Sequence, residues 1–304
     1  MENIIKQAGI SDVLDNEKIA SLFINKDRVI SKNTVPGLIV DTAEIKDGVK
    51  IDINLKDNVN IDMPVHLCFG VTDKKAIQKI ILKLAIGENS SISIYSHCVF
   101  PSAEDVIHAM DAAITVGKNS KYEYFERHIH SEEGGIKVVP KAIVTLEDNA
   151  RYKSEFELMR GRVGRIDMDY EVFCNSFSVM DMSVRINGRG NDIINIKEAG
   201  NLIGNNARGA LTSRIAVRDN ASANIYNKLI ATADYARGHV DCKEIVRDNG
   251  TANAVPVVEV RNPRAHITHE ASIGSVDSKE LQTLMSRGLN EEQAVELIIG
   301  GLLS

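Results

Sequence analysis

The sequence contains no tryptophan and only four cysteines among its 304 residues. The cysteines, at positions 68, 98, 174 and 242, lie far apart and form no CxxC pair, which argues against a disulfide framework and a zinc ribbon. We therefore expect free thiols, so a metal site must draw on other residue types or on a second chain. The absence of tryptophan weighs against a sugar-degrading enzyme, because indole rings commonly stack on sugars.

Long apolar runs and blocks of one charge are also missing. No stretch approaches the twenty apolar residues of a membrane span, and the N-terminal segment lacks the apolar core of a signal peptide. The 36 basic and 42 acidic residues are dispersed and give a net charge of −6, which indicates neither nucleic-acid nor membrane binding. We expect a cytoplasmic protein. Without GxxxxGK[ST] or a strand-to-helix GxGxxG, neither ATP hydrolysis nor dinucleotide binding is predicted for this chain.

A repeat of about 30 residues runs through the middle of the chain. Similar polar turns carry asparagines at positions 58, 89, 119, 149, 220 and 249, and Asn175 and Asn206 are candidate degenerate members of the series. Asparagine adopts positive φ more readily than most residues, so each is expected at a sharp turn. Alternating segments such as 91–95 and 121–125 follow the turns and predict strands with one buried face.

Repeated strand–turn units without intervening helices predict a mainly β protein, a β-solenoid with one or two strands per rung. An antiparallel sandwich remains the alternative. Residues 1–35 are predicted to form short helices, with Asn16 as an N-cap. Such a helical segment could cap one end of the solenoid, whereas the other end would be free to pair with a second copy of the chain.

A helical hairpin is predicted for residues 275–304. Asp277 and Glu280 have the spacing of a capping box, as do Asn290 and Gln293, and Gly288 is expected to end the first helix. Gly300-Gly301 is expected to end the second. The apolar stripes of the two helices contain Leu281, Leu284, Met285, Ala294, Leu297 and Ile298, which pack on the last rung or bind a partner.

Candidate metal ligands gather in residues 237–304. Cys242 is the leading candidate because thiolates bind iron–sulfur clusters, although a lone cysteine in a strand is more often a buried inert thiol. His269 and Glu270 are adjacent and would face opposite ways on a regular strand, so both serve one site only if the strand ends or bulges there. His239 is a further candidate ligand or hydrogen-bond partner, although it shares the strand face opposite to Cys242.

A second polar group, Glu126, His128, His130 and Glu132, has period-two spacing and could chelate a divalent metal on one side of a strand. Because no third-strand ligand is evident, an exposed polar strand face is the preferred interpretation.

The C-terminal part resembles the SufB/SufD family of Suf-type iron–sulfur cluster scaffold proteins. The resemblance rests on Cys242, on the segment His269-Glu270-Ala271-Ser272-Ile273-Gly274, and on the tail pattern of Leu281, residues 286–289, Glu291-Glu292, Ala294 and residues 298–300. It implies a right-handed parallel β-helix. It also implies that Cys242, His269 and Glu270 hold the cluster, Glu270 being typical of the SufB branch. Thr268 stands where some relatives carry another acid.

The resemblance further implies a function and its partners. We expect residues 1–35 to be a helical preface, 36–274 the β-helix core, and 275–304 a docking segment for an ABC-type ATPase resembling SufC. The chain would assemble iron–sulfur clusters de novo and pass them on. Because this chain carries Cys242 and His269 together, we expect a homodimer joined through the C-terminal end of the β-helix, in place of the heterodimer that the resemblance implies. A non-catalytic SufD-like structural partner and a polysaccharide-acting enzyme are the alternatives.

Overall fold

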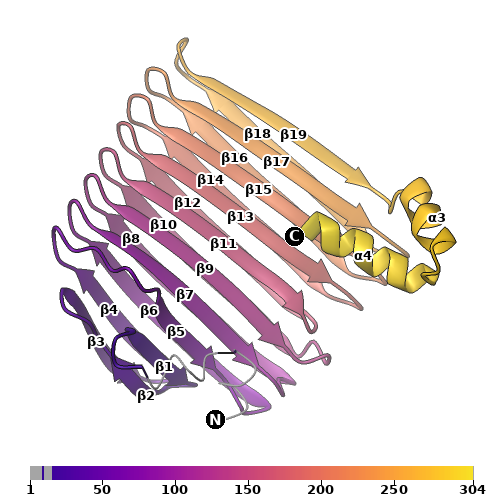
Figure 1. Ribbon diagram of the computed structural model, residues 1–304, viewed down its shortest axis with the longest axis horizontal. Coiled ribbons are helices and arrows are strands. Elements are labelled where there is room, and N and C mark those ends of the chain that lie inside the picture. Colours follow the sequence, from indigo (N-terminus) through magenta and orange to yellow (C-terminus); the bar gives the residue numbers. More distant parts are fainter. Residues whose placement is uncertain (1–8, 10–15, 304) are drawn as a thin grey trace.

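Two facing β-sheets wound from one continuous coil form the body of the protein (Figure 1). The computed structural model describes residue 9 and residues 16–303. Ten strands form the first sheet: β1 (Ser21–Asn25), β2 (Arg28–Asn33), β5 (Val65–Gly70), β7 (Ser91–Phe100), β9 (Lys121–His130), β11 (Arg151–Arg160), β13 (Val179–Gly188), β15 (Arg208–Val217), β17 (Arg237–Val246) and β19 (His266–Gly274).

Nine strands form the facing sheet: β3 (Leu38–Ile45), β4 (Gly48–Leu55), β6 (Lys75–Ile86), β8 (Asp105–Val116), β10 (Ile136–Leu146), β12 (Arg165–Cys174), β14 (Ile193–Leu202), β16 (Ser222–Ala231) and β18 (Thr251–Val260). From β5 onward, successive strands alternate between the sheets, so each repeat contributes two strands. All ladders in the described part are parallel except the β1–β2 and β3–β4 hairpins. The solenoid prediction is therefore confirmed, and the antiparallel sandwich is excluded.

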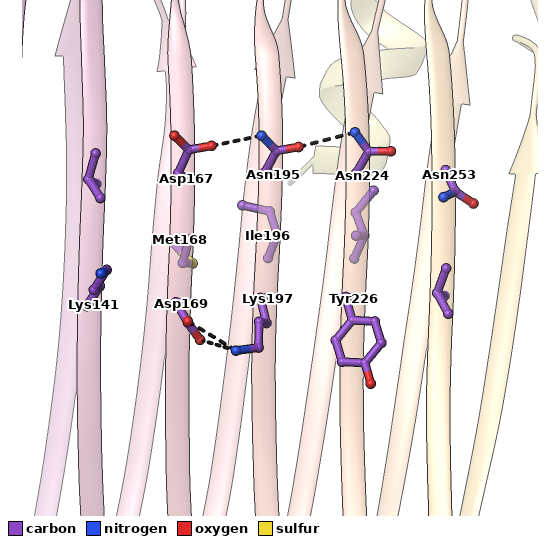
Figure 2. Close-up of a pocket in the computed structure, with 13 residues that line it drawn as sticks. Lys141, Asp167, Met168, Asp169, Asn195, Ile196, Lys197, Asn224, Tyr226 and Asn253 are labelled. Carbon is purple, nitrogen blue, oxygen red and sulfur yellow. Dashed lines mark hydrogen bonds and ion pairs between the residues drawn. The ribbon is translucent and has the colours of Figure 1, made fainter.

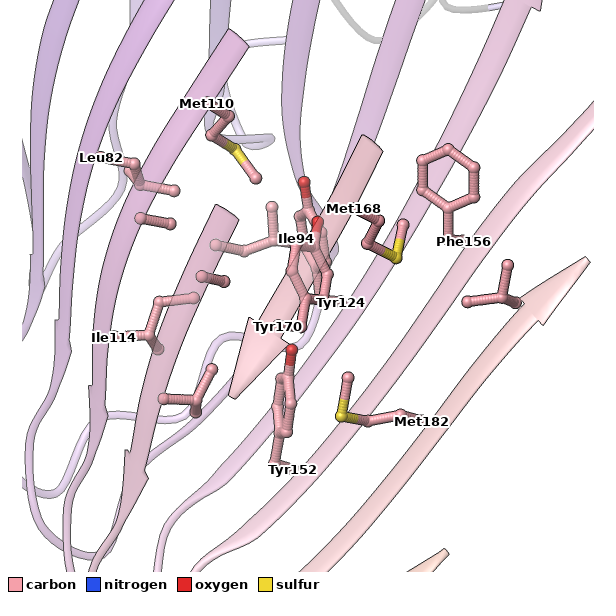
Figure 3. Packing of buried hydrophobic residues seen from close by; sticks show 14 of the residues in the cluster. Leu82, Ile94, Met110, Ile114, Tyr124, Tyr152, Phe156, Met168, Tyr170 and Met182 are labelled. Atoms are coloured by element: carbon pink, nitrogen blue, oxygen red, sulfur yellow. The ribbon is translucent and has the colours of Figure 1, made fainter. Parts of the chain in front are cut away.

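Alternation along each strand builds the core between the sheets. In β9, Tyr122 and Tyr124 are buried, whereas Lys121 is exposed on the outer face. Figure 3 shows Tyr124, Tyr152 and Tyr170 among the aliphatic and methionine side chains that fill this space. The period-two signal in the sequence therefore marks inward-facing positions correctly.

The turn asparagines adopt positive φ as predicted at Asn58, Asn89, Asn119 and Asn149. Their side chains also form a ladder between rungs. Nδ2 of Asn119 donates to Oδ1 of Asn89 at 2.9 Å, and Nδ2 of Asn149 donates to Oδ1 of Asn119 at 3.0 Å. Each amide thus links its own turn to a neighbouring one, and asparagine tolerates the positive φ that the turn requires.

Later turns depart from this pattern. Asn206 has positive φ, but Phe177, not Asn175, takes that position in its turn. In the last two turns of the series the positive φ falls on Asp219 and Asp248, one residue before the asparagines. Because aspartate also tolerates positive φ, the positive-φ position can move one residue before the asparagine and the turn is still formed.

The predicted N-terminal helices are wrong over residues 16–35. This segment forms the β1–β2 hairpin, and β1 pairs in parallel with β5, where Leu22 lies beside Leu67. Ser21 to Ile24 are all buried, because β1 is covered on both faces. A short apolar run buried on both faces has no period-two signature and is easily mistaken for a helix. The rest of that prediction concerns residues 1–15, which lie outside the described residues apart from Gly9.

Two helices follow the last strand: α3 (Ser278–Ser286) and α4 (Glu291–Leu303). The Asp277 carboxylate accepts from the backbone N–H groups of Lys279 and Glu280 at 2.9 and 2.8 Å, and α3 ends before Gly288, whose φ is +98°. Asn290 and Gln293 form the reciprocal capping box. No helix in the described part is long and apolar enough to span a membrane.

The expected stop of the second helix at Gly300-Gly301 is wrong, because α4 continues to Leu303. Its buried residues Val295, Ile299 and Leu303 form an apolar cluster with Ala216 on the outer face of the ten-stranded sheet. This packing offsets the low helix propensity of the glycines. The hairpin therefore does not sit on the last rung: α4 lies across the sheet beside β15 and β17 (Figure 1).

Candidate functional site

The C-terminal end of the solenoid is open. β18 and β19 are the outermost strands of their sheets, and no described segment pairs with their free edges. Inward-facing Val258 and Ile267 of this last rung are only partly buried, whereas Val240 on the preceding β17 has no exposed surface. The core is therefore fully buried only as far as the rung before the last.

Cys242 lies on β17 and points into this buried part of the core. Its side chain is fully buried, between Ser213 on β15 and Ala271 on β19 in the parallel ladders. The side-chain amide of Asn227, from the facing sheet, lies 3.6 Å from its Sγ atom. Burial raises the pKa of the Cys242 thiol, so the thiol is protonated and shielded in this conformation.

His269 and Glu270 lie on opposite faces of β19. The strand neither ends nor bulges there and pairs in register with β17 as far as Gly274. The His269 side chain therefore starts from the inner face, the face of Cys242, but it is exposed because no rung covers it. Glu270 starts from the outer face, where one carboxylate oxygen lies 3.7 Å from Nζ of Lys243. One chain places Cys242 and His269, but not Glu270, on one side of the sheet.

His239 is on the outer face of β17, as the alternation predicts. Its Nδ1 atom lies 2.8 Å from Oγ1 of Thr268, so the two side chains are linked across the last ladder. The sheet separates this pair from Cys242. At this end of the described chain, no three histidine, cysteine or acidic side chains bring their ligand atoms together.

Two buried carboxylates near Cys242 were not anticipated from the sequence. Glu244 faces inward two residues after Cys242, where its Oε1 accepts from Ser213 Oγ at 3.0 Å and its Oε2 has no partner. Burial raises the pKa of Glu244 to about 7 and that of Glu198 to about 8. Glu244 follows Cys242 by two residues, so strand alternation puts both side chains on the same face. The polar residues around Glu244 in the sequence hid this signal.

The group at 126–132 does not form the exposed face that the sequence suggested. Glu126, His128 and His130 all point into the core and are at most 7% exposed, since they continue the inward series of Tyr122 and Tyr124. Only Glu132, beyond the end of β9, is exposed, and its carboxylate lies 3.1 Å from Arg189. Among the described residues, the one gathering of ligand atoms is Cys98, His108, Glu126 and His128.

A shallow concavity occupies the outer face of the nine-stranded sheet (Figure 2). Asn195 donates to Asp167 at 2.8 Å and accepts from Asn224 at 3.2 Å, forming a polar ladder. Asp169 is paired with Lys197 at 3.1 Å. Because both aspartates are engaged by neighbouring side chains, this surface does not present the free pair of acids that glycoside hydrolysis needs.

An apolar groove separates α3 from α4, lined by Leu284, Leu297 and Ile298 together with the polar side chains of Lys279, Glu280 and Thr283. Leu297 is 56% exposed and Met285 is 42% exposed, while Leu281 is partly buried against the sheet cluster. The predicted partner-binding residues thus lie mainly on the face of the hairpin that the sheet leaves free.

The chain is similar to proteins of iron–sulfur cluster assembly. The sequence family described as "SUF system FeS cluster assembly, SufBD core domain" matches residues 71–302. An iron–sulfur cluster assembly SufBD family protein of Pyrococcus horikoshii is 38% identical over 300 residues, covering 99% of this chain and 91% of the relative. A protein of the same description from Methanocaldococcus jannaschii is 36% identical over 282 residues, covering 93% and 89%. The chain therefore belongs to the SufBD family of SUF-system iron–sulfur cluster assembly proteins.

Proposed function

We propose that the chain is a SufB-like scaffold on which an iron–sulfur cluster is assembled de novo and from which it is transferred. The observation that carries the proposal is the position of Cys242, one rung inside the open end and on the same sheet face as His269. Cysteine thiolate and imidazole together make a mixed ligand set, which suits a cluster that must be released.

The cluster site is proposed to lie at the seam of a homodimer. The free edges of β18 and β19 are surfaces that a second strand can extend by backbone hydrogen bonds. Since Glu270 faces away from Cys242 within one chain, the second copy is a source for the missing carboxylate. His239, bonded to Thr268 on the outer face, orients the last ladder in this arrangement.

The partner is proposed to be an ABC-type ATPase resembling SufC. The groove between α3 and α4 offers it Leu284, Leu297 and Ile298, and exposed Met285 and partly buried Leu281 of α3 are proposed to extend this surface. The opposite face of α4 is anchored on the sheet. Because Cys242 is fully buried, iron and sulfide reach it only after movement at the last rung. ATP-driven motion of the partner, transmitted through α4, would supply that opening.

Two further properties complete the proposal. Right-handed winding is expected because parallel crossover connections are nearly always right-handed. Four free, buried cysteines suit the reducing cytoplasm.

Anaerobic reconstitution with ferrous iron and sulfide tests the scaffold function, with the ATPase partner present. We expect the wild type and C174S, a matched buried cysteine variant, to form a cluster with visible absorption. C242S and H269A should lose most of it while the complex stays intact by size-exclusion chromatography. E270A tests whether the Glu270 carboxylate is a ligand: loss of the cluster in this variant would include the carboxylate in the ligand set, and a retained cluster would leave it out. Equal cluster content in C242S and wild type would instead assign the SufD-like structural role, which the complete burial of Cys242 favours.

A further inference from the structure

A second cluster of ligand side chains lies deep inside the solenoid, far from the open end. It consists of Cys98 on β7, His108 on β8, and Glu126 and His128 on β9. One ligand atom from each lies within 4.8 Å of all the others, and none of these residues is more than 3% exposed. Cys98 and His128 are direct neighbours in the parallel ladder, and His108 reaches them from the facing sheet.

The neighbours of His108 fix which ring nitrogen faces the cluster. Gln78 donates through Nε2 to the backbone carbonyls of Lys26 and Gly70 at 2.8 and 3.2 Å, so its Oε1 must be the acceptor toward Nδ1 of His108, at 2.8 Å. Nδ1 of His108 therefore carries the proton. The lone pair of its Nε2 faces Sγ of Cys98 at 3.8 Å.

A histidine relay fixes His128 in the same way. The carbonyl of Arg162 accepts from Nδ1 of His130 at 2.9 Å, which leaves Nε2 of a neutral His130 as an acceptor. Nδ1 of His128 lies 3.1 Å from that atom and is its donor. The Nε2 lone pair of a neutral His128 is thus directed into the cluster, at 2.8 Å from Oε1 of Glu126. Outer hydrogen bonds that set the tautomer of a ring in this way are typical of metal-binding histidines.

Two tyrosine hydroxyls hold the other carboxylate oxygen of Glu126, Oε2. The Tyr124 hydroxyl donates to Oε2 at 3.0 Å, and the Tyr170 hydroxyl lies 3.5 Å from it; both rings are among those drawn in Figure 3. Oε1 is left facing the Nε2 lone pair of His128. Two acceptors at this distance need a shared cation: either a proton on the line between them, or a metal ion that binds both and moves them about 0.5 Å farther apart.

We propose that Cys98, His108, Glu126 and His128 form a binding site for a divalent transition-metal ion of the zinc and ferrous class, separate from the cluster site at Cys242. Around a tetrahedral ion with one sulfur ligand, zinc-type bond lengths put the ligand atoms roughly 3.3 to 3.6 Å apart. Sγ of Cys98 is 3.8 Å from Nε2 of His108 and 3.7 Å from Oε1 of Glu126, so these two edges are only slightly longer, whereas the 2.8 Å edge between Glu126 and His128 must widen when the ion binds.

Charge balance and surroundings agree with this assignment. A thiolate and a carboxylate neutralise a divalent ion, which a buried site requires because uncompensated charge is costly there. Phe100 and Phe156 pack beside the two imidazoles, with ring centroids 5.1 Å from His108 and 4.9 Å from His128. These rings exclude water and favour thiolate and imidazole ligation. A proton shared between His128 and Glu126 is the competing explanation.

Cobalt is a suitable probe because thiolate coordination gives it charge-transfer absorption. The full-length chain carrying C242S, which removes the other candidate thiol ligand, is unfolded with a chelator and a reductant, and is then refolded with Co²⁺ after the chelator is removed. Refolding gives the ion access to a site that the folded chain encloses. Bound cobalt is measured per chain, and circular dichroism verifies that the fold is recovered.

We expect about one tightly held cobalt ion per chain with thiolate charge-transfer absorption. The additional substitution C98S should abolish that absorption, and H128Q should weaken cobalt binding at least tenfold, whereas C174S should change neither. If C98S does not refold, E126Q decides, since it keeps the shape and the tyrosine contacts while removing the charge, and at least tenfold weaker binding is expected. A refolded C242S chain that retains no cobalt, or variants that bind as well as it does, would assign the cluster to the shared proton and overturn the proposal.

Discussion

His269 lies directly beside Val240 in the parallel ladder between β19 and β17, which puts its side chain on the sheet face that carries Cys242. In the same ladder Glu270 lies beside Asp241 on the opposite face. The three predicted cluster ligands are therefore divided by the sheet, and their assembly into one site requires a second copy or a rearrangement of the last strand.

Mixed dimers distinguish these two routes. If Cys242 of one copy and Glu270 of the other complete each site, a dimer of one C242S chain and one E270A chain keeps one intact site and one doubly defective site. We expect such dimers, isolated with two different affinity tags, to hold about half of the wild-type iron and sulfide, whereas each homodimeric variant holds little. Failure of the mixed dimer to recover cluster content would place both ligands within one chain.

Leu297 should be a main contact for the ATPase partner. L297D puts a charge on the exposed side of α4, opposite the buried residues Val295 and Ile299, so the helix should remain folded on the sheet. We expect the dissociation constant for the partner to rise at least tenfold, since burying an unpaired charge in an apolar contact costs more than the roughly 1 to 3 kcal/mol of an unpaired neutral polar group. Isothermal titration calorimetry measures this. I203D, at a residue 47% exposed in a distant turn, is the control and should bind normally.

The buried carboxyl group of Glu198 should make stability depend on pH. Its pKa is raised to about 8 by burial, above the unfolded value, so the folded chain holds a proton that the unfolded chain has lost. The free energy of unfolding should therefore fall as pH rises from about 4.5 to about 8. E198Q removes this loss, and we expect it to be about 4 kcal/mol more stable than wild type at pH 8 and nearly equal at pH 4.5.

Urea denaturation at the two pH values measures the effect. E88Q, on an exposed turn, is the control and should follow the wild-type profile. An E198Q chain whose stability falls with pH as steeply as that of wild type would show that Glu198 is not the group responsible.

Asn119 should stabilise both its own turn and the stacking of rungs. N119A removes hydrogen bonds to Asn89 and Asn149 and places a Cβ-bearing residue without a polar side chain at φ +59°. We expect a loss of about 2 kcal/mol. N119G removes the same hydrogen bonds but tolerates the backbone, so it should lose about 1 kcal/mol less. Equal stability of the two variants in urea denaturation would contradict a backbone contribution.

The sequence predicts the solenoid because the signal is repeated. Asn58, Asn89, Asn119 and Asn149 mark successive turns at a nearly constant spacing of about 30 residues, and the strands after them alternate with one buried face. The N-terminal hairpin was missed because Leu22 and Phe23 are buried on opposite faces of β1 and so give no alternation. The predicted end of the first helix at Gly288 is confirmed, whereas that of the second at Gly300-Gly301 is wrong because contacts of Leu303 with the sheet carry α4 past the two glycines.

The candidate sites show the same limit. The period-two rule puts His269 and Glu270 on opposite faces, and likewise His239 and Cys242, as the structure has them, but it does not say which face is buried. The sequence predicted a polar surface at Glu126 and His128 because the preceding residues on the same strand face are tyrosines, which occur both in cores and at surfaces. His108 and Cys98 join them from strands about 20 and 30 residues away, a proximity set by the coil and invisible to local pattern.

The two ends of the coil offer different strand edges to another copy. At the C-terminal end, β18 and β19 continue the parallel direction of their sheets, but at the other end of the described chain the outermost strands β2 and β3 run antiparallel to their neighbours. Head-to-tail stacking would therefore not continue the coil. Association through two C-terminal ends uses the same surface on both partners and covers the edges of β18 and β19. Such pairing would hide the parallel strand edges that otherwise make a protein prone to fibre formation.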